Sequence, residues 1–316
     1  MKKTLSFVLM CSIFAMFLTG CGNNMSRKEY TIATANKTGV YYPIGEALSM
    51  ILKQEYPEVT LKVIETSGSL ENINLLKDKK VDFALLQNDI AFYAANSEAM
   101  FAGKEKIKNI SGIATLFPEI IHFVVRKDSN INSISDLASH TISVGSEGSG
   151  TYYNAMQILT VAGVWDSINK QTLDSTRSME ELQAGKIDGF IFTVGLPNQS
   201  IANLGKKVEI KLLSLEAELI QKLVSQYSFY YPSMITASQY PWQTEEISGL
   251  EINAILVSSE NVSDDDQYLI TKVLFGKPNE LGKSNPHLSK MTKASLRHQL
   301  SIKLGKGAFK AHSELK

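Results

Sequence analysis

Residues 141–159, with the sequence TISVGSEGSGTYYNAMQIL, predict a strand, a glycine-rich loop and a helix in succession. Residues 141–144 favour a strand, and the three glycines that follow keep the loop free of bulky side chains. Ser149 or Thr151 can cap the helix, whose apolar side chains recur at helical spacing. Because the first N–H groups of a helix have no intrahelical acceptor and the dipole favours negative charge, this loop is a candidate anion site.

The same order of features occurs once more, near the start of the chain. Residues 31–34 lead through Gly39 to Tyr41 and Tyr42, and a helix follows with a proline in its first turn. A second similarity follows each copy, because KVDFALLQ at 80–87 parallels KIDGFIFT at 186–193. One long-range repeat of this kind predicts two similar α/β lobes, whereas a solenoid repeats every ~20–50 residues.

Length and charge restrict the class of protein. The chain has 316 residues, enough for two domains of ordinary size. Lysine plus arginine and aspartate plus glutamate number 32 each, so the chain lacks the overall basic charge expected of a nucleic-acid-binding protein. The composition therefore predicts a globular protein with no nucleic-acid partner.

The N-terminus is typical of an exported bacterial protein. Lys2 and Lys3 precede an apolar run at 5–18 that is shorter than the ~20 residues a membrane span needs, so residues 1–20 predict a signal peptide. The run ends in Leu-Thr-Gly-Cys21, which resembles the bacterial lipobox and implies cleavage before Cys21 and its lipidation (palmitate among the attached chains). The alternative is an ordinary signal peptide that contains a cysteine. If Cys21 is lipidated, residues 21–29 form a lipidated tether, and the protein is extracytoplasmic and anchored to a bacterial membrane.

Three loops in the first part of the chain should point into one crevice. A turn at 66–69 follows a β-rich run at 59–64 and can cap a helix, and Gln87 follows the apolar strand 81–86. In open α/β sheets, ligands bind outside the carboxyl ends of the strands. Loops 36–42, 67–69 and 87–89 therefore predict one side of a ligand cleft.

The order of predicted elements indicates a bilobal α/β fold with two strands crossing between the lobes. The strand at 120–126 is the first crossing, and the strand at 251–258 is the second. Lobe 1 is predicted to comprise residues 30–125 and 251–316, and lobe 2 residues 126–250. Residues 227–241, which are rich in tyrosine, proline and serine, are predicted to be irregular surface or a linker.

Catalytic, cofactor and metal motifs are absent from the sequence. No nucleotide-binding loop, dinucleotide fingerprint or nucleophile elbow occurs, and none of the five histidines has metal-ligand spacing. His122 lies in an apolar strand and is expected in the core or hinge, and Asp82 and Asp188 are expected to be turn or cap residues. Asp264, with the two aspartates after it, has the position of acidic residues at a helix N-terminus. We therefore predict no catalytic residue, no cofactor and no metal.

Taken together, the motifs resemble the TAXI family of solute-binding proteins of tripartite ATP-independent periplasmic (TRAP) transporters, from about Tyr30 to the end. The matching segments are TGVYYPIG at 38–45, TSGSLEN at 66–72, VDFA at 81–84 with QND at 87–89, VGS at 144–146 with GSGT at 148–151, and GLPN at 195–198. The resemblance implies a two-lobed type-II periplasmic-binding-protein fold with a ligand cleft between the lobes. Such a receptor closes on a small anionic solute, glutamate-like or a dicarboxylate, and delivers it to a TRAP-type membrane permease. Two departures are Glu147, where the family tends to have proline, and LGKGA at 304–308 in place of His-Pro-Gly-Ala.

The candidate ligand-binding residues come from both lobes. They are Gly39, Tyr41, Tyr42, Ser67, Gly68, Ser69, Gln87, Ser149, Gly150, Thr151 and Gly195. The residues at 149–151 would bind a carboxylate, those at 67–69 and 87 would contact it from the other lobe, and a tyrosine would form a lid or stacking surface. Two alternatives remain: a binding protein that serves a membrane sensor kinase, and an enzyme on the same fold with Asp89 and Glu147 as weak candidates for a titratable pair.

Overall fold

The computed structural model describes residues 24–291 and 300–314, and these residues form one ten-stranded sheet with helices on both faces. The predicted signal peptide and Cys21 lie outside the described residues. The strands are β1 Glu29–Ala33, β2 Thr60–Ile64, β3 Phe83–Gln87, β4 Ile110–Arg126, β5 Thr141–Ser143, β6 Asn169–Gln171, β7 Gly189–Gly195, β8 Ile210–Leu212, β9 Tyr231–Ile235 and β10 Ile247–Ser259. The α-helices are α1 Tyr41–Glu55, α2 Ser69–Lys77, α3 Asn88–Asn96, α4 Gly150–Val161, α5 Ser175–Gln183, α6 Gln199–Leu204, α7 Ala217–Gln226, α8 Asp264–Gly276, α9 Pro278–Ser284 and α10 Lys306–Glu314.

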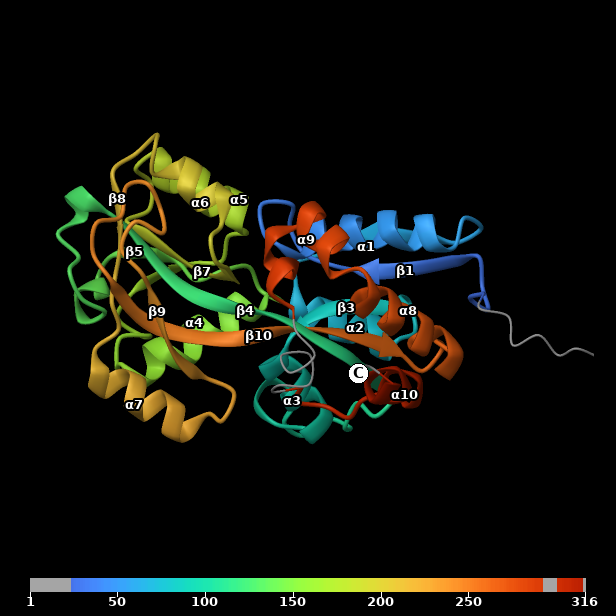
Figure 1. Cartoon of the computed structure of the whole chain (residues 1–316). Helices are drawn as coiled ribbons and strands as arrows, with labels where there is room; N and C mark the ends of the chain where they lie inside the picture. Colours follow the sequence, from blue (N-terminus) through green and yellow to red (C-terminus); the bar gives the residue numbers. More distant parts are fainter. Residues whose placement is uncertain (1–23, 292–299, 315–316) are drawn as a thin grey trace, which may run out of the picture.

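The elements gather in two lobes, as the sequence predicts (Figure 1). Lobe 1 contains β1 to β3 with α1 to α3 and the C-terminal helices α8 to α10, and lobe 2 contains β5 to β9 with α4 to α7. The strand order is β2-β1-β3-β10-β4-β7-β5-β6, with β8 on β4 and β9 on β10. The sheet is therefore continuous through both lobes.

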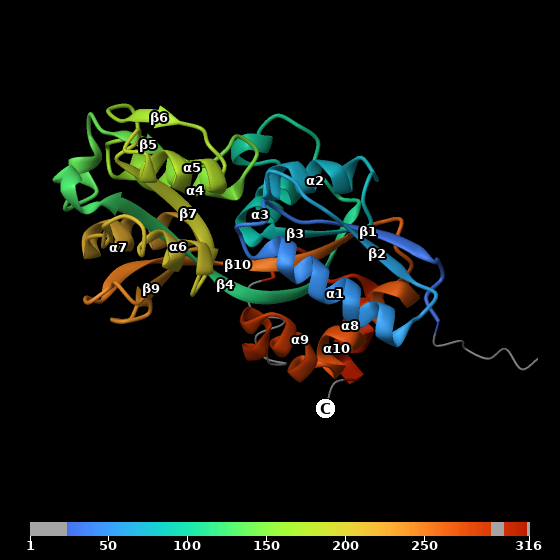
Figure 2. The same ribbon diagram turned by 90° about the horizontal axis from the view of Figure 1, so that it is seen from above.

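Strands β4 and β10 join the lobes and run side by side between them (Figure 2). They pair antiparallel from Glu251 opposite Ile120 to Ser259 opposite Ile110, with two register shifts on the way. β4 begins ten residues before the predicted crossing strand and spans 17 residues. Because both crossings lie in one hydrogen-bonded ladder, the lobes can move relative to each other only by bending or twisting this pair of strands.

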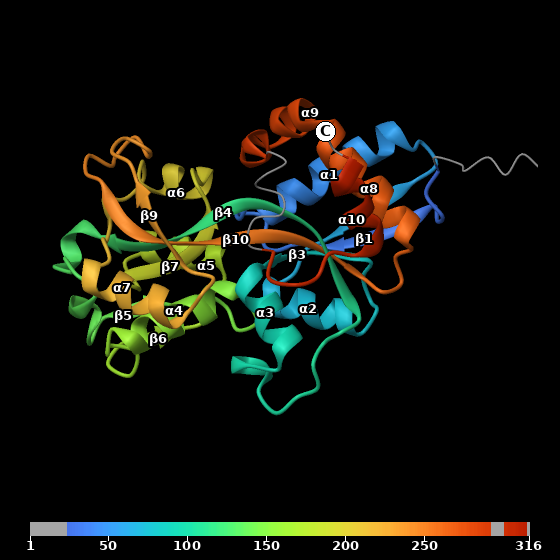
Figure 3. The ribbon, with the colours of Figure 1, turned by 60° about the horizontal axis from the view of Figure 1, so that its bottom comes forward.

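Each face of the sheet has its own core, and both cores extend across the two lobes. Along β3, Phe83 and Leu85 contribute to one core, whereas Ala84 and Leu86 contribute to the other. Helices α1, α8 and α9 cover the first face in lobe 1 and α2 and α3 cover the second (Figure 3). The near-continuous apolar run of β3 thus follows from its burial on both faces.

The predicted internal repeat is present in the structure, and its two aspartates have the same structural role. The backbone N–H of Thr31 donates to Asp82 Oδ2 at 2.8 Å, and the N–H of Thr141 donates to Asp188 Oδ2 at 2.8 Å. Each aspartate, which directly precedes β3 or β7, therefore joins the start of that strand to its parallel neighbour, β1 or β5. Both carboxylates accept backbone hydrogen bonds, as is expected of turn or cap residues.

The prediction of an irregular segment at 227–241 is wrong. This segment contains β9, which pairs with the start of β10, and Phe229, Tyr230 and Tyr240 are buried. Proline at 232 misled the prediction, because proline is compatible with an edge strand that donates no hydrogen bond at that position. Phe229 and Tyr230 share a core with the buried side of α7, whereas Tyr240 packs in the core on the other face of the sheet.

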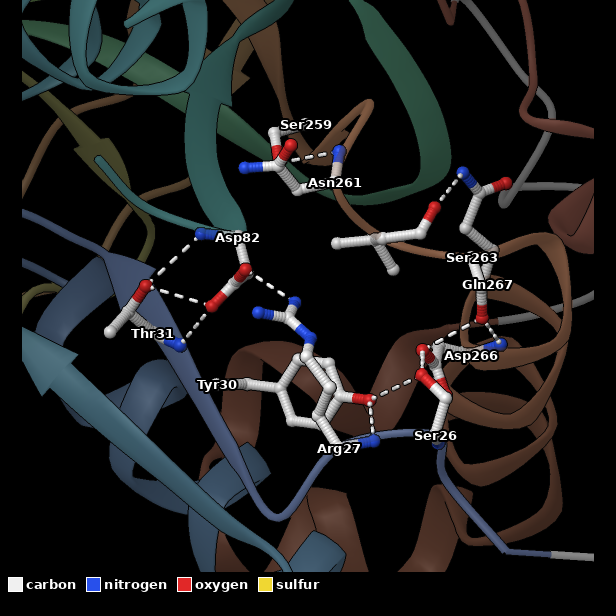
Figure 4. A network of polar contacts seen from close by, with 11 residues as sticks. Ser26, Arg27, Tyr30, Thr31, Asp82, Ser259, Asn261, Ser263, Asp266 and Gln267 are labelled. Carbon is white, nitrogen blue, oxygen red and sulfur yellow. Dashed lines mark hydrogen bonds and ion pairs between the residues drawn. The ribbon is translucent and has the colours of Figure 1, made fainter. Parts of the chain in front are cut away.

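A polar network fixes the segment before β1 to the body of lobe 1 (Figure 4). The N–H and hydroxyl of Ser26 donate to the carboxylate of Asp266, which also accepts from Ser263 Oγ at 2.7 Å. Arg27 pairs with Asp82 and lies over the Tyr30 ring. Burial raises the pKa of Asp266, but the hydrogen bonds from Ser26 outweigh this effect, and the pKa lies below its ordinary value. Asp266 therefore has a structural role at the start of α8.

Replacement of Asp82 by alanine should lower the free energy of unfolding by about 2–3 kcal/mol, because it removes the partners of Thr31 and Arg27. Urea denaturation measures the change. Asp78→Ala is the matched control, since Asp78 is exposed at the end of α2 and should change stability by less than about 0.5 kcal/mol. Equal losses in the two variants would contradict the structural role of Asp82.

Candidate functional site

A cavity of about 460 Å³ lies between the lobes, at the carboxyl ends of β1, β3, β5 and β7. It is lined by residues of the three loops that the sequence places together in lobe 1 and by the glycine loop and α5 of lobe 2. Nine of the eleven predicted ligand residues line it: Gly39, Tyr41, Ser67, Gly68, Ser69, Gln87, Ser149, Gly150 and Thr151.

Tyr42 and Gly195 do not line this cavity. The Tyr42 ring lies under Lys37 Nζ, 5.1 Å from its centroid, and borders a separate surface groove beside Met50. A Cβ atom on Gly195 would come within 2.8 Å of His287 Nδ1, so this glycine permits the close approach of His287. The double tyrosine motif thus divides between the cavity and the outer side of α1.

The start of α4 offers backbone donors to the cavity. Ser149 is the N-cap: its Oγ accepts from the N–H of Tyr152 at 3.1 Å and donates to the carbonyl of Ser146 at 2.7 Å. The hydroxyl of Ser149 is therefore used by the fold. The N–H groups of Gly150 and Thr151, at the next two positions, have no intrahelical acceptor and are available to an anion.

Thr151 retains a hydroxyl hydrogen to donate, whereas the hydroxyl of Ser69 also forms a side-chain hydrogen bond with Tyr41. Thr151 Oγ1 accepts from the N–H of Thr193 at 3.1 Å, and Ser69 Oγ accepts from the N–H of Gln87 at 3.0 Å. A hydroxyl that accepts one hydrogen bond still has its own O–H. Both side chains are buried and line the cavity.

Gln87 and Gly150 are in contact across the two lobes. A Cβ atom on Gly150 would lie 1.8 Å from Gln87 Oε1, so a side chain at this position would displace the amide. The Gln87 side chain is 3% exposed, and Oε1 has no hydrogen-bond partner among the described residues. The close approach of the lobes therefore requires a glycine at 150, whose lack of a side chain also leaves the helix N–H groups accessible.

The lobes make direct hydrogen bonds on both sides of the cavity. On one side the carbonyl of Gly148 accepts from the N–H groups of Leu70 and Glu71 at 3.0 and 3.3 Å. On the other side Thr38 Oγ1 and Ser175 Oγ share a hydrogen bond of 2.5 Å. The structure is thus the closed arrangement, and the N-terminus of α2 is satisfied by lobe 2.

The hydroxyl of Ser67 is also used within the protein. Its Oγ and its N–H both donate to Glu71 Oε2, at 2.6 and 2.7 Å. This resembles half of a capping box, in which a carboxylate in the first turn reaches back to the residues before the helix. Of the three predicted serine ligands, only Ser69 has a side chain that is free of a carboxylate or capping partner.

Behind the cavity, buried polar groups connect α3 to α4. Asn154 Nδ2 donates to Asp89 Oδ2 at 2.8 Å, and Thr193 Oγ1 donates to Asn154 Oδ1 at 2.9 Å. Asp89 is fully buried, and burial raises the pKa of its carboxyl group to about 7, against smaller opposing effects of its hydrogen bonds to Ile90 and Asn154. Asp89 does not line the cavity, although it follows Gln87 by two residues.

Glu119, which the sequence analysis missed, lines the base of the cavity. The Tyr41 hydroxyl donates to Glu119 Oε2 at 2.7 Å, and both side chains are buried. Burial raises the pKa of Glu119 to about 8; the hydrogen bond from Tyr41 opposes the shift, and the nearby Asp89 carboxyl adds to it. A carboxyl group within the apolar run 113–125 was the signal that could have identified this position.

The charged residues that lobe 2 contributes to the cavity, Asp174 and Arg177, have partners within that lobe. Among the described residues that line it, the one arginine is Arg177, whose guanidinium contacts Glu181 at 2.5 Å and Glu180 at 3.4 Å. Glu147 is exposed and does not line the cavity. His122 is buried and bonded to Tyr240, and burial lowers its pKa to about 4, which fits the predicted core position. The described part of the chain contains no cluster of three or more histidine, cysteine or acidic residues that could hold a metal.

The two-lobed fold is similar to that of solved periplasmic solute-binding proteins. The alkanesulfonate-binding protein SsuA from Xanthomonas axonopodis pv. citri, bound to MOPS, is similar with a TM-score of 0.52 and 13% identity, covering 91% of this chain and 84% of its own. A mutant of ArgBP from T. maritima is similar with a TM-score of 0.50 and 14% identity, covering 84% and 95%. The model of the NMT1-like family matches residues 32–315, and the chain belongs to this family.

Substitution of Gly150 by alanine should destabilise the closed protein by about 1–3 kcal/mol, because the new Cβ overlaps Gln87. In a Gln87→Ala background the same substitution should cost much less. Thermal or urea unfolding of the two single variants and the double variant measures this coupling. Additive effects would show that the two residues do not contact each other in solution.

Proposed function

We propose that the protein is an extracytoplasmic receptor that binds a small organic anion in the interlobe cavity and has no catalytic activity of its own. The observation that carries this proposal is the start of α4, where the N–H groups of Gly150 and Thr151 face a closed cavity. Helix N-termini bind carboxylates and phosphates because the unpaired amides and the dipole both favour negative charge. The size of the cavity suits an amino acid or dicarboxylate.

Donors from both lobes would hold the anion. Gly150 and Thr151 would bind one carboxylate with their backbone N–H groups, and the hydroxyl of Thr151 would add a donor. The Gln87 amide would contact the ligand from lobe 1: its Nε2 would donate to the anion, and its Oε1, which has no partner among the described residues, would accept from a donor group of the ligand. No unpaired cation of the described residues lines the cavity, so recognition would rest on dipoles and hydrogen bonds.

Ligand binding would stabilise the closed state by differential affinity. A ligand that touches Gln87 of lobe 1 and Thr151 of lobe 2 makes both contacts only when the lobes are together. The hydrogen bonds of Gly148 with α2, and of Thr38 with Ser175, also exist only in that state. Closure would then proceed by bending of the β4–β10 pair, in the manner of a hinge between domains.

Delivery to a membrane permease completes the proposed function. The sequence motifs favour a TRAP-type permease, whereas a structurally similar protein from Staphylococcus aureus, with a TM-score of 0.50 and 11% identity, is described as the ligand-binding component of an ABC-type import system; its match covers 90% of each chain. Lipidation at Cys21 would anchor the protein to the membrane, with residues 21–29 as the tether. The lobe boundaries would fall within the crossing strands, near residues 125 and 250. No helix in the described part of the chain is long and apolar enough to cross a membrane.

Replacement of Thr151 by tryptophan should abolish binding of the anion and leave the fold intact. The indole would fill the cavity between α4 and Gln87, while the backbone of α4 keeps its cap at Ser149. Isothermal titration measures binding, and circular dichroism measures the fold. Replacement of exposed Glu147 by tryptophan is the control that should retain affinity. Unchanged affinity of the Thr151 variant would remove the start of α4 from the site.

A thermal-shift screen of the protein without residues 1–21 should identify the ligand class. Binding to the folded state alone raises stability by about 2.7 kcal/mol at a hundredfold excess of ligand over Kd. Amino acids, dicarboxylates and keto acids form the test set, and the matched amides of the same acids form the control. A shift with an acid and none with its amide would support an anion receptor, and a shift with uncharged solutes alone would contradict it.

A further inference from the structure

Glu119 places a carboxyl group at the base of a cavity whose other donors suit an anion. Its side chain is 3% exposed, and its Oε2 accepts from the Tyr41 hydroxyl at 2.7 Å. An ionised carboxylate here would repel a bound anion, with little solvent to screen the two charges. The site is compatible with an anion only if Glu119 is neutral or has a counter-charge.

No cation among the described residues provides that counter-charge. From α1 the facing titratable group is Tyr41, and from α3 it is the carboxyl group of Asp89. Across the cavity, Arg177 of α5 is already paired with Glu181. On the neighbouring strand β7 the residue opposite Glu119 is Gly195, which packs against His287.

Strand β10 adds no cation beside Glu119 either. Its residue opposite Glu119 is Ile252, and Glu251 lies opposite Ile120, on the other face of the sheet. The groups that surround Glu119 are therefore the Tyr41 phenol, the Asp89 carboxyl group and apolar side chains, with the His287 ring behind Gly195. Such surroundings favour the protonated form of a carboxyl group, because burial and a second acidic group both disfavour its charge.

We propose that Glu119 is a proton-linked ligand contact: its carboxyl group is protonated when an organic anion occupies the cavity, so that the anion and one proton are bound together. This inference rests on the proposed function. In the complex, Oε2 still accepts from Tyr41, and the protonated carboxyl group donates its O–H to the anion or to a group that bridges to it. The only covalent bond formed is the O–H bond, and its proton comes from the solvent.

Proton linkage gives the affinity a direction with pH. Burial raises the pKa of Glu119 to about 8, so the carboxyl group is mostly protonated at pH 7 and mostly ionised at pH 9. With a pKa of about 8, the protonated fraction of Glu119 falls about tenfold between pH 7 and pH 9. Because the anion binds the protonated form, Kd should rise about tenfold over the same interval. Binding above pH 8 should take up a proton from the buffer.

The first test uses the protein without ligand. The side-chain carboxyl carbon of Glu119, assigned by comparison with Glu119→Gln, is titrated by NMR in protein labelled with ¹³C-glutamate. A midpoint well above the ordinary range, near pH 8, is expected. A midpoint near 4.5, the ordinary value, would overturn the proposal without bearing on the anion receptor, because neither the cavity nor the start of α4 depends on this titration.

The second test measures the coupling by isothermal titration. Succinate, glutarate and 2-oxoglutarate are the probes, because all are fully ionised at both pH 7 and pH 9. Each is titrated at both pH values and in two buffers of different ionisation enthalpy, which reports the protons taken up. The proposal predicts the tenfold rise in Kd for wild type, and a loss of this pH dependence in Glu119→Gln, whose amide cannot ionise.

Two further variants serve as controls. Glu147→Gln removes an exposed carboxylate of the glycine loop, outside the cavity, and should keep the tenfold ratio of Kd between pH 9 and pH 7. Asp89→Asn removes the neighbouring buried acid and should lower the pKa of Glu119, which moves the pH dependence to lower pH but does not abolish it. A pH ratio that survives in Glu119→Gln would overturn the assignment to Glu119.

The outcomes separate the two proposals. If an acid binds wild type equally at pH 7 and pH 9 with no proton uptake, the anion receptor stands and the role of Glu119 is refuted. If none of the three acids binds at pH 7, and the screen finds no other anion, the receptor function and the proton linkage both fail.

Discussion

The paired strands β4 and β10 are the constraint on which the rest of the structure depends. They are the only described segments that belong to the sheet of both lobes, and their ladder runs from residue 110 opposite 259 to residue 120 opposite 251. Because the sheet is continuous, the carboxyl ends of β1 and β3 in one lobe and of β5 and β7 in the other meet across the same pair of strands. This position makes the cavity, and it places Glu119 of β4 at its base. The cavity and the connection between the lobes therefore share strand β4, so a ligand that contacted Glu119 would also contact a crossing strand.

Much of the fold could be predicted because its signals are local. The repeated strand, glycine loop and helix, the apolar run of β3, and the equivalent aspartates Asp82 and Asp188 all follow from spacing within about ten residues. The segment at 227–241 could not be predicted in this way. Its strand β9 is specified by pairing with β10 and by packing of Tyr230 and Tyr240, and these contacts depend on tertiary structure that composition does not report.

The candidate site was predictable in place but less so in chemistry. The loops that follow predicted strands contained nine of the residues that line the cavity, because the carboxyl edge of an α/β sheet brings such loops together. Residue type alone did not show which hydroxyls the fold itself uses: Ser149 caps α4, and Ser67 is bonded to Glu71. Nor did it show that Gly150 is required by contact with Gln87, or that a glutamate in an apolar strand faces the cavity. Each of these facts depends on a partner far away in the sequence.

The polar network at Ser26 and the C-terminal helices have a consequence for the order in which a new chain can fold. Asp266, the partner of Ser26, lies at the start of α8, and β10 separates β3 from β4 in the sheet. Until about 250 residues have been synthesised, β3 and β4 keep unpaired edges and the face of lobe 1 beneath α8 is uncovered. Lobe 1 therefore cannot close during synthesis of its own N-terminal half. A chain whose first lobe is completed only by its last fifth therefore remains incompletely folded until synthesis is nearly finished.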